Sequence, residues 1–273
     1  MSCYFKIKDV KVVSLMIKET FAIDLSDFTL VLLKLRYEQF CVEHKVLNVE
    51  VFINNLNLSK DLQNELLAFI FRNEFELFRD PALWRSLKEE VLPSFTRDIQ
   101  YRVWIPSCFE GSELLSFLIL RAEMGMVNKL QVIYTTPIEN LNRAKIGFAY
   151  DERKYAQNLS NYKRIDGVDL DEKYFQNKSN MLVPINSLFD NTVYKEFCEV
   201  KNGILNKNVN LVLYRNRLLR YNKNLQKVVC DNLLSSLKVG GFLTLGIKEN
   251  LPIENSMGKF RVFNKKESIY KKI

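Results

Sequence analysis

Residues 210–246 read NLVLYRNRLLRYNKNLQKVVCDNLLSSLKVGGFLTLG, and this stretch decides the fold. Its first apolar run, residues 211–214, is typical of a buried strand, and FLTL near its end gives a second strand. Between them, leucines and valines recur at helical spacing until a Gly-Gly pair at 240–241 ends the predicted helix. Strand–helix–strand units of this kind build parallel sheets, whose ligands bind beside the carboxyl ends of the strands. Arg215 and Asn216 follow the first strand, so they are either site residues or a simple strand cap.

The composition is that of an ordinary globular protein. The chain has 273 residues, of which 47% are hydrophobic and 26% charged, and this suits one large domain or two smaller ones. No apolar run approaches the roughly 20 residues of a membrane helix. The first residues carry lysines and an aspartate rather than a signal peptide. Scattered cysteines without a CxxC pair predict neither a zinc site nor a disulfide framework. We therefore expect a cytoplasmic protein without membrane insertion or bound metal.

The net charge of +8 suits nucleic acid, an anionic membrane or an acidic protein partner. This charge is spread along the chain, and no basic helix or alternation of aromatic and basic residues supports a nucleic-acid site. A solvated basic surface explains the charge equally well, and we expect no nucleic-acid partner. The single histidine, His44, lies in a helical pattern and argues against histidine-dependent hydrolysis.

The first part of the chain reads as a series of helices, and we expect a helical N-terminal domain over residues 1–95. Ser59 is placed to cap one of these helices. Asp80 and Pro81 predict the start of another helix, with Asp80 as its cap and Trp84 on its buried face.

The second part alternates strands and helices, which predicts a doubly wound α/β domain over residues 96–273. Ser112 is expected to cap the helix that follows the first strand. Residues 150–195 have weak periodicity, and we expect a small variable insertion with a helix and a short strand or hairpin. The other expected elements are strands at 101–105, 130–134 and 181–185, a helix near 138–144, and an edge hairpin at 260–263 and 268–270.

Four segments, in this order, resemble the CheR family of chemotaxis receptor methyltransferases. NEFELFRDPALWRSLKEEVLP begins at residue 73 and is similar to the family's Asn-x-Thr-x-Phe-Phe-Arg-Asp segment. RVWIPSCFEGSELLS, LVLYRNRLLRYNKNLQKVV and LKVGGFLTLG are similar to its Ser-x-Gly-Glu-Glu, Cys-Arg-Asn and Leu-x-Pro-Gly-Gly segments. The resemblance runs over residues 28–272. It implies a doubly wound sheet like that of class I S-adenosylmethionine (SAM) methyltransferases, preceded by an all-helical N-terminal domain.

The resemblance implies an enzyme that transfers a methyl group from SAM to a protein glutamate in chemotaxis-like signalling and leaves S-adenosylhomocysteine (SAH). Arg79 would then meet the SAM carboxylate, and Glu113 would accept a hydrogen bond from the SAM ammonium group. Arg220 falls where the family has a tyrosine near the substrate. The implied cofactor-binding residues are Asn73, Arg79, Gly111, Glu113, Asn202, Arg215 and Asn216. The implied catalytic residues are Arg79, Asn216 and Arg220.

Besides Arg220, further positions depart from the family pattern. Phe75 replaces a threonine, and Pro137 replaces the acidic residue that would hold the ribose hydroxyls. Phe109 and Glu110 replace small loop residues of the family, and Phe109 would plug an empty cofactor pocket. Two hypotheses follow, an active methyltransferase and an inactive relative that binds a protein partner. Several of the implied site residues also have an interpretation without a cofactor. Glu113 is then a first-turn acid favoured by the helix dipole, and Asn73 is a helix end. Arg79 and Asp80 then form a local ion pair and cap.

The helical domain resembles the family's receptor-docking domain, in which a run of arginines meets acidic receptor helices. The comparable stretch here is residues 34–45, KLRYEQFCVEHK, which has fewer arginines and added acids. We expect a protein substrate or signalling partner. A chemoreceptor-like helix is one candidate, and a different protein is the other.

Overall fold

The structure is a computed structural model, and it describes residues 3–21, 23–71, 75–96, 100–106, 108, 110–136, 148–149, 151–178, 181–196, 198, 200–204, 206–251 and 259–273. The chain forms two compact units. The helical unit comprises Met1–Arg72 and Arg217–Gln226, and the α/β unit comprises Asn73–Asn216 and Lys227–Ile273. The chain therefore passes between the units three times. Within the described ranges, none of the helices is long and apolar enough to cross a bilayer.

Four helices make up most of the helical unit: α1 (Ile7–Phe21), α2 (Leu30–Glu43), α3 (Val49–Leu58) and α4 (Lys60–Phe71). Polar side chains start two of them. Asn48 Oδ1 accepts the N–H of Glu50 at 2.7 Å, and Ser59 Oγ accepts the N–H of Leu62 at 3.1 Å. The cap predicted at Ser59 is thus confirmed. The buried aromatic side chains of this unit include Phe5, Tyr37, Phe40 and Phe52.

The segment 217–226 returns to the helical unit from the other end of the sequence and contains the 3₁₀ turn η6 (Leu218–Arg220). Phe28 and Tyr221 form an isolated antiparallel bridge, and their ring centroids are 5.3 Å apart. The ring of Phe28 also lies 5.6 Å from that of Phe71, edge to face. Aromatic packing and backbone pairing therefore hold the returning segment within this unit.

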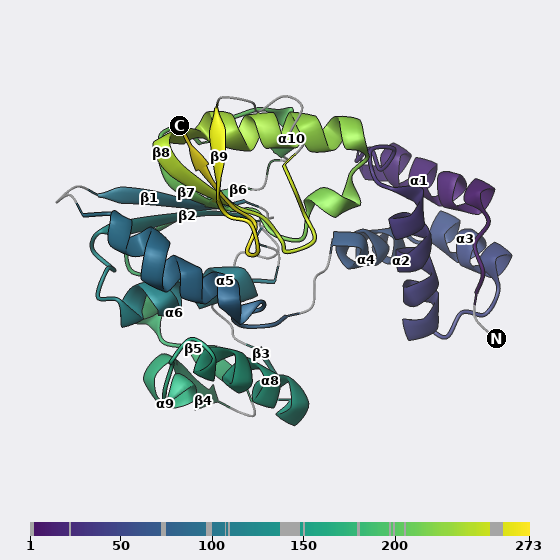
Figure 1. The fold of residues 1–273 in the computed structure, drawn as a ribbon. Coiled ribbons are helices and arrows are strands. Elements are labelled where there is room, and N and C mark those ends of the chain that lie inside the picture. The colour runs from purple at the N-terminus through teal and green to yellow at the C-terminus, as the bar shows by residue number, and fades with distance from the viewer. Residues whose placement is uncertain are drawn as a thin grey trace. The chain divides into compact units, whose positions relative to one another are not determined.

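A seven-stranded sheet in the order β6-β2-β1-β7-β8-β10-β9 forms the centre of the α/β unit. Its strands are β1 (Tyr101–Ile105), β2 (Leu130–Thr136), β6 (Thr192–Glu196), β7 (Val209–Leu213), β8 (Leu237–Thr244), β9 (Phe260–Asn264) and β10 (Ile269–Lys272). The first five strands in the spatial order are parallel, and β10 pairs antiparallel with β8 and β9. Figure 1 shows α6 (Ser112–Glu123) and α10 (Lys223–Ser236) on opposite faces of the sheet. The predicted doubly wound α/β class and C-terminal edge hairpin are confirmed.

The Gly-Gly pair lies inside β8, although the sequence suggested that it separates the helix from the strand. α10 ends directly before β8 begins. Gly240 has a φ of +79°, a value that favours glycine. A Cβ atom on Gly241 would lie 2.9 Å from a carbonyl oxygen of its own strand and 3.1 Å from that of Asn210 in β7. The pairing of β7 with β8 shifts register here. The two glycines therefore accommodate a strand irregularity instead of stopping the helix.

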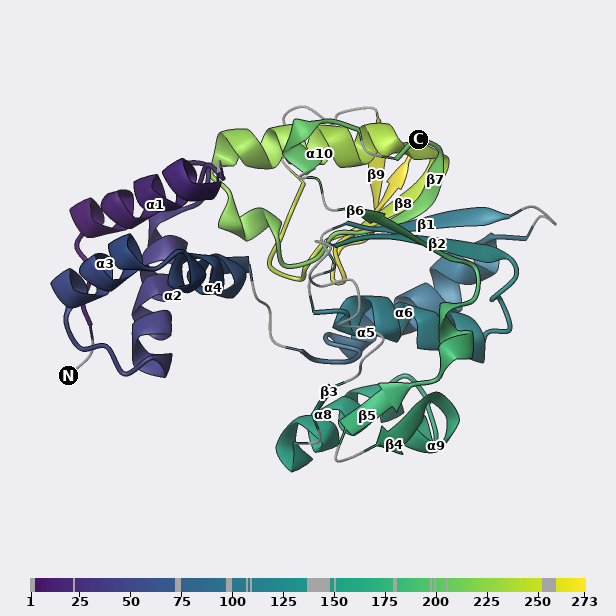
Figure 2. The same cartoon turned by 180° about the vertical axis from the view of Figure 1, so that it is seen from behind.

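A small sheet subdomain lies between β2 and β6 in the sequence. It contains α8 (Glu152–Lys163), α9 (Leu170–Tyr174) and an antiparallel sheet ordered β3-β5-β4, with strands Phe148–Ala149, Met181–Pro184 and Phe175–Lys178. Figure 2 shows this sheet beside α8. The helix and the hairpin lie within the predicted insertion at 150–195, whose last residues enter the main sheet as β6. The helix predicted near 138–144 lies outside the described residues.

The last helix of the N-terminal helical run belongs to the α/β unit. α5 (Pro81–Ser86) continues into the π-helical turn Leu87–Val91. Trp84 is buried, and its ring centroid lies 5.6 Å from that of Phe78 in the same unit. Trp84 and the residues after it join the core beneath the sheet. The units therefore divide at residues 72 and 73, and not near residue 95 as the sequence suggested, because this helix buries its apolar face against the strands.

Candidate functional site

The carboxyl ends of β1 and β7 lie side by side where the chain changes direction across the sheet. From β1 the chain continues through α6 to β2 on one side, whereas β7 lies on the other side of β1. Trp104 near the end of β1 pairs with Val212 near the end of β7. Open α/β sheets bind their ligands at such a switch point. The segments that follow these two strands carry Glu113 and Arg215, two of the predicted site residues.

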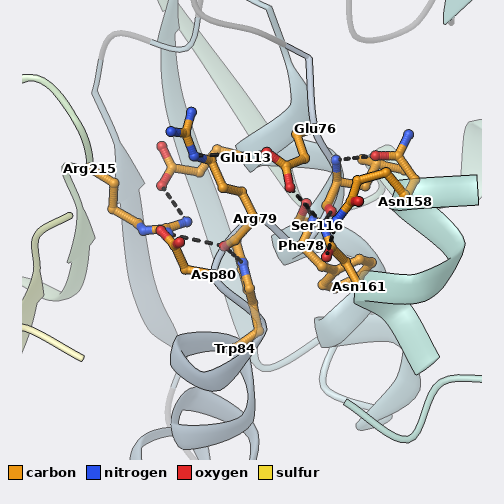
Figure 3. Close-up of polar contacts among 12 residues, drawn as sticks. Glu76, Phe78, Arg79, Asp80, Trp84, Glu113, Ser116, Asn158, Asn161 and Arg215 are labelled. Carbon is orange, nitrogen blue, oxygen red and sulfur yellow. Dashed lines mark hydrogen bonds and ion pairs between the residues drawn. The ribbon is translucent and has the colours of Figure 1, made fainter. Parts of the chain in front are cut away.

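Arg215 is the centre of a charged cluster at this edge, which Figure 3 shows in close-up. Its side chain is only 4% exposed. Nη2 lies 2.6 Å from Asp80 Oδ2 and donates to the carbonyl oxygen of Arg79 at 3.0 Å. Nη1 lies 3.7 Å from Glu113 Oε1, and the guanidinium carbon lies 5.6 Å from the centre of the Trp84 ring. The structure thus brings together Arg79, Glu113 and Arg215, which lie far apart in the sequence.

Asp80 has a different role from the one its sequence context suggested. It lies at the N-cap position of α5, as expected, but its side chain makes no capping hydrogen bond. Its carboxylate pairs with Arg215 instead, because a charge-assisted bond to a buried guanidinium is stronger than a cap to a backbone N–H. The interpretation of these two residues without a ligand was a local ion pair between Arg79 and Asp80. In the described contacts, Arg79 Nε lies 3.9 Å from Glu76 Oε2 instead.

Residues 76–80 form a tight turn that presents Arg79, and we call it the arginine turn. The Arg79 side chain is 43% exposed. Its carbonyl oxygen accepts hydrogen bonds from Trp84 Nε1 at 2.8 Å and from Arg215. Phe78 and Asp80, which flank Arg79, both have positive φ values, of 51° and 57°. The backbone of Arg79 is therefore fixed, while its guanidinium remains accessible to a ligand.

Gly111 and Glu113 lie at the start of α6. Gly111 has a φ of 80° and occupies the N-cap position, so Ser112, predicted as the cap, is the first helical residue. Glu113 is in the first turn, where the helix dipole favours a carboxylate, and its side chain is 22% exposed. It also faces Arg215, so Glu113 is both a first-turn acid and a member of the charged cluster.

Asn216 is anchored by a buried carboxylate that the sequence analysis did not identify. The Asn216 N–H donates to Glu249 Oε2 at 2.8 Å, and the N–H of Gly246 donates to the same oxygen at 2.7 Å. Glu249 therefore ties the end of β7 to the end of β8. A Cβ atom on Gly246 would lie 2.5 Å from Asn216 Oδ1, so only glycine leaves room for that amide. No local pattern marks Glu249 in the sequence, because Leu245, Gly246, Ile247 and Lys248 separate it from the end of β8.

A third carboxylate, that of Glu267, lies within electrostatic range of the cluster. Burial raises the pKa of Glu267, the negative charge of Asp80 raises it further, and Arg215 acts in the opposite direction. The turn between β9 and β10 therefore contributes to the field around Arg215. Among the described residues, no three histidine, cysteine or acidic side chains gather in a way that could hold a metal ion.

The remaining predicted residues lie elsewhere or outside the described chain. Asn202 ends the turn η5 (Val200–Asn202), and its Nδ2 donates to Cys198 Sγ at 3.9 Å. Arg220 is buried in the helical unit, where Nη1 donates to the carbonyl oxygen of Phe71 at 3.2 Å. Phe75 is partly buried against the core of the α/β unit. The residues outside the described ranges are Asn73, Phe109 and Pro137.

Thr136, the last residue of β2, is a further polar residue at this edge that the sequence analysis did not identify. It is 1% exposed, and its hydroxyl has no hydrogen-bond partner within the described parts of the chain. A buried hydroxyl of this kind usually has a partner. It directly precedes the position where the family resemblance places the acid for the ribose.

Comparison with known proteins connects this geometry to a family. Residues 73–269 match the family model described as CheR methyltransferase, SAM binding domain. Cher3 of Pseudomonas putida, which is named as a methyltransferase, is 30% identical over 211 residues, or 76% of this chain and 76% of Cher3. The chemotaxis protein methyltransferase of Listeria monocytogenes is 23% identical over 248 residues, or 89% of this chain and 90% of its own length.

Among solved structures, an O-methyltransferase family protein from Burkholderia thailandensis is similar with a TM-score of 0.37 and 12% identity. The match covers 74% of this chain and 47% of that protein, so the chain spans less than half of its length. The matched family domain binds SAM, which is therefore the cofactor of the α/β unit. The family match and the P. putida relative together show that the chain belongs to the CheR methyltransferase family.

Proposed function

We propose that the protein transfers a methyl group from SAM to a carboxylate side chain, a glutamate, of a partner protein in chemotaxis-like signalling. The observation that carries the proposal is the cluster around Arg215, which gathers Arg79 and Glu113 at the switch point of the sheet. The relative from L. monocytogenes, named a chemotaxis protein methyltransferase, supports the same reaction class.

The side chains in this cluster suit the amino-acid end of SAM, which carries a carboxylate and an ammonium group. The Arg79 guanidinium is accessible and binds the carboxylate, and the Glu113 carboxylate accepts a hydrogen bond from the ammonium group. Gly111 lets the backbone approach the cofactor. The buried Thr136 hydroxyl offers a further polar contact at the end of β2. The other proposed cofactor-binding residues are Asn73, Asn202, Arg215 and Asn216.

The reaction makes modest demands on the protein. When bound, SAM supplies an electrophilic methyl group on its sulfonium sulfur. The accepting carboxylate is already ionised at neutral pH, so this chain does not need a strong general base. Its residues contribute alignment and a preorganised charged environment. We assign Arg79 and Asn216 to the walls of the site.

The substrate is proposed to be a cytoplasmic protein that the helical unit helps to bind, such as a chemoreceptor-like helix. The second candidate is a catalytically weak or inactive relative that acts as a protein-binding signalling module. The replacement of the ribose acid by Pro137 favours this second candidate. Each lost charge-assisted hydrogen bond weakens binding by about tenfold to a hundredfold.

The binding test is a calorimetric titration of the full chain with SAH. The wild type should bind SAH, and Arg79→Ala and Glu113→Gln should each weaken binding by about tenfold or more. Glu152→Gln is the matched control, because Glu152 is also a first-turn acid, in α8, far from the cluster in the sequence. The control should bind like the wild type. Absence of binding heat and of any melting shift with millimolar SAH or SAM would establish the inactive alternative.

The reaction test uses SAM with a radiolabelled methyl group and a cell extract that contains candidate protein substrates. A methyl ester on a carboxylate releases volatile methanol in base, whereas a methylated amine does not. We expect base-labile label in protein with the wild type and little with Arg79→Ala. Label that withstands base would contradict carboxylate methylation while leaving the family assignment intact.

A further inference from the structure

The arginine turn is held by side chains from several other elements of the α/β unit. Trp84 of α5 and Arg215 after β7 donate to the carbonyl oxygen of Arg79 at 2.8 and 3.0 Å. Ser116 of α6 accepts the N–H of Phe78 at 2.8 Å. Each of these bonds fixes the backbone and leaves the arginine side chain accessible.

The small sheet subdomain provides a second set of contacts through α8. Asn158 and Asn161 are three positions apart on this helix, so they share one face, and each is 1% exposed. Asn158 Oδ1 accepts the N–H of Leu77 at 2.9 Å, and Asn161 Nδ2 donates to the carbonyl oxygen of Leu77 at 3.0 Å. The two amides bind both backbone groups of one residue, as a neighbouring strand would.

Asn161 also reaches the side chain that faces Arg79. Its Nδ2 donates to Glu76 Oε1 at 2.9 Å, and Glu76 Oε2 lies 3.9 Å from Arg79 Nε. Figure 3 shows Asn161, Glu76 and Arg79 in this order across the turn. A buried amide of the small subdomain thus fixes the carboxylate that orients the exposed guanidinium.

The backbone conformation explains why so many contacts converge here. Phe78 and Asp80 are both left-handed, a conformation that side chains with a Cβ atom adopt at an energetic cost. The ring of Phe78 is buried, with its centroid 5.6 Å from that of Trp84 and 5.2 Å from that of Tyr162 in α8. Strained turns of this kind persist where the surroundings over-determine them, and they cluster at functional sites.

We propose that Asn161 is a positioning residue for Arg79, through which the small sheet subdomain sets the affinity for the S-adenosyl ligand. The proposal rests on the proposed function, in which Arg79 binds the carboxylate of that ligand. Asn161 acts through Glu76 and the backbone of Leu77, without touching the ligand itself. The subdomain is therefore a structural part of the cofactor site.

A double-mutant cycle on SAH binding by the full chain tests this inference. Asn161→Ala should weaken SAH binding by about fivefold. Arg79→Ala should weaken it more. The double variant Arg79→Ala/Asn161→Ala should bind like Arg79→Ala within about twofold, because the route from Asn161 to the ligand passes through Arg79.

Two further variants separate positioning from general loosening. Tyr174→Phe removes the hydrogen bond at 2.7 Å from the subdomain to Glu123 of α6 without touching the arginine turn, and it should leave SAH affinity unchanged. Glu76→Gln keeps an acceptor for Asn161 but removes the charge opposite Arg79. It should weaken SAH binding by about twofold to threefold, and only when Arg79 is present.

The outcomes are distinguishable from those of the proposed function. A wild type that binds no SAH overturns both. A wild type that binds, together with an Asn161→Ala effect that persists in the Arg79→Ala background, overturns only the positioning role. A loss of SAH affinity in Tyr174→Phe equal to that in Asn161→Ala also overturns only the positioning role. If Asn161→Ala does not fold, the Glu76→Gln cycle decides alone, and an effect independent of Arg79 overturns the proposal.

Discussion

Arg215 is a buried cation that faces two carboxylates, and it pairs more closely with one of them than with the other. The bond to Asp80 is short, at 2.6 Å, whereas the contact with Glu113 is 3.7 Å. Asp80 is therefore the main counter-ion of Arg215, and Glu113 is the more distant of the two carboxylates. This division of roles follows from distance alone.

At the residue scale, removing Asp80 should destabilise the protein strongly. Asp80→Ala leaves the buried Arg215 without its closest counter-ion, and we expect a loss of roughly 3 kcal/mol in the free energy of unfolding. Urea denaturation measures this loss. The double variant Asp80→Leu/Arg215→Met should recover much of the stability while still losing SAH affinity. Equal stability of Asp80→Ala and the wild type would contradict the pairing.

The sequence could nominate some site residues but could not pair them. Arg215 and Glu113 follow predicted strands, so their common edge was predictable from the parallel-sheet rule. Asp80 was misassigned, because Asp-Pro is a strong local sign of a helix start while its real partner lies 135 positions away. Nothing local marks Asn158, Asn161 or Glu249, whose roles depend on tertiary contacts.

At the scale of elements, α6 and the small sheet subdomain are joined through one carboxylate. Glu123 Oε1 accepts hydrogen bonds from Tyr162 at 2.5 Å and from Tyr174 at 2.7 Å. Burial acts to raise the pKa of Glu123, but these hydrogen bonds and the positive charges of Lys173 and Lys88 together outweigh it, and the pKa is lowered. The ionised form of Glu123 therefore favours the folded state.

This tether predicts a pH-dependent stability. A lowered pKa in the folded state stabilises the protein above the ordinary glutamate pKa of about 4.3, and the contribution disappears as the pH falls through the folded value. Near pH 6 the wild type should exceed Glu123→Gln in free energy of unfolding, and the difference should shrink below about pH 4. Urea denaturation across this range measures it, and a constant difference would argue against the tether.

The elements of the sheet were largely predictable, because alternating strands and helices carry strong periodic signals. β1, β2, β7 and the β9–β10 hairpin lie where the apolar runs predicted them. The Gly-Gly pair misled the prediction because it usually ends helices, and only the register shift between β7 and β8 reveals its role. Likewise, Ser112 resembles a cap, but Gly111 already fills that position with a left-handed backbone.

At the scale of the whole molecule, the sequence predicted two parts but placed their border at the wrong helix. A run of helices does not show which core each helix joins, and α5 joins that of the α/β unit. The return of residues 217–226 to the helical unit was equally invisible, because those residues continue directly from the predicted site segment.

The returning segment gives a prediction for the helical unit. Phe28 is buried and packs on both Tyr221 and Phe71, so Phe28→Ala should lower the free energy of unfolding by about 3–5 kcal/mol. Val31→Ala in α2 is the control, because Val31 is exposed and should change stability by less than about 0.5 kcal/mol. Thermal unfolding measures both. A Phe28→Ala variant as stable as this control would contradict the packing.

The two-piece composition of the helical unit restricts how this protein can be rearranged by recombination. Fusing residues 1–72 alone to another protein would transfer an incomplete helical unit. Tyr221 and the other residues of the returning segment would be missing from the fusion. For the same reason, a single proteolytic cut cannot release the complete helical unit. Exchanging the helical unit between relatives therefore requires moving two separate pieces of chain together.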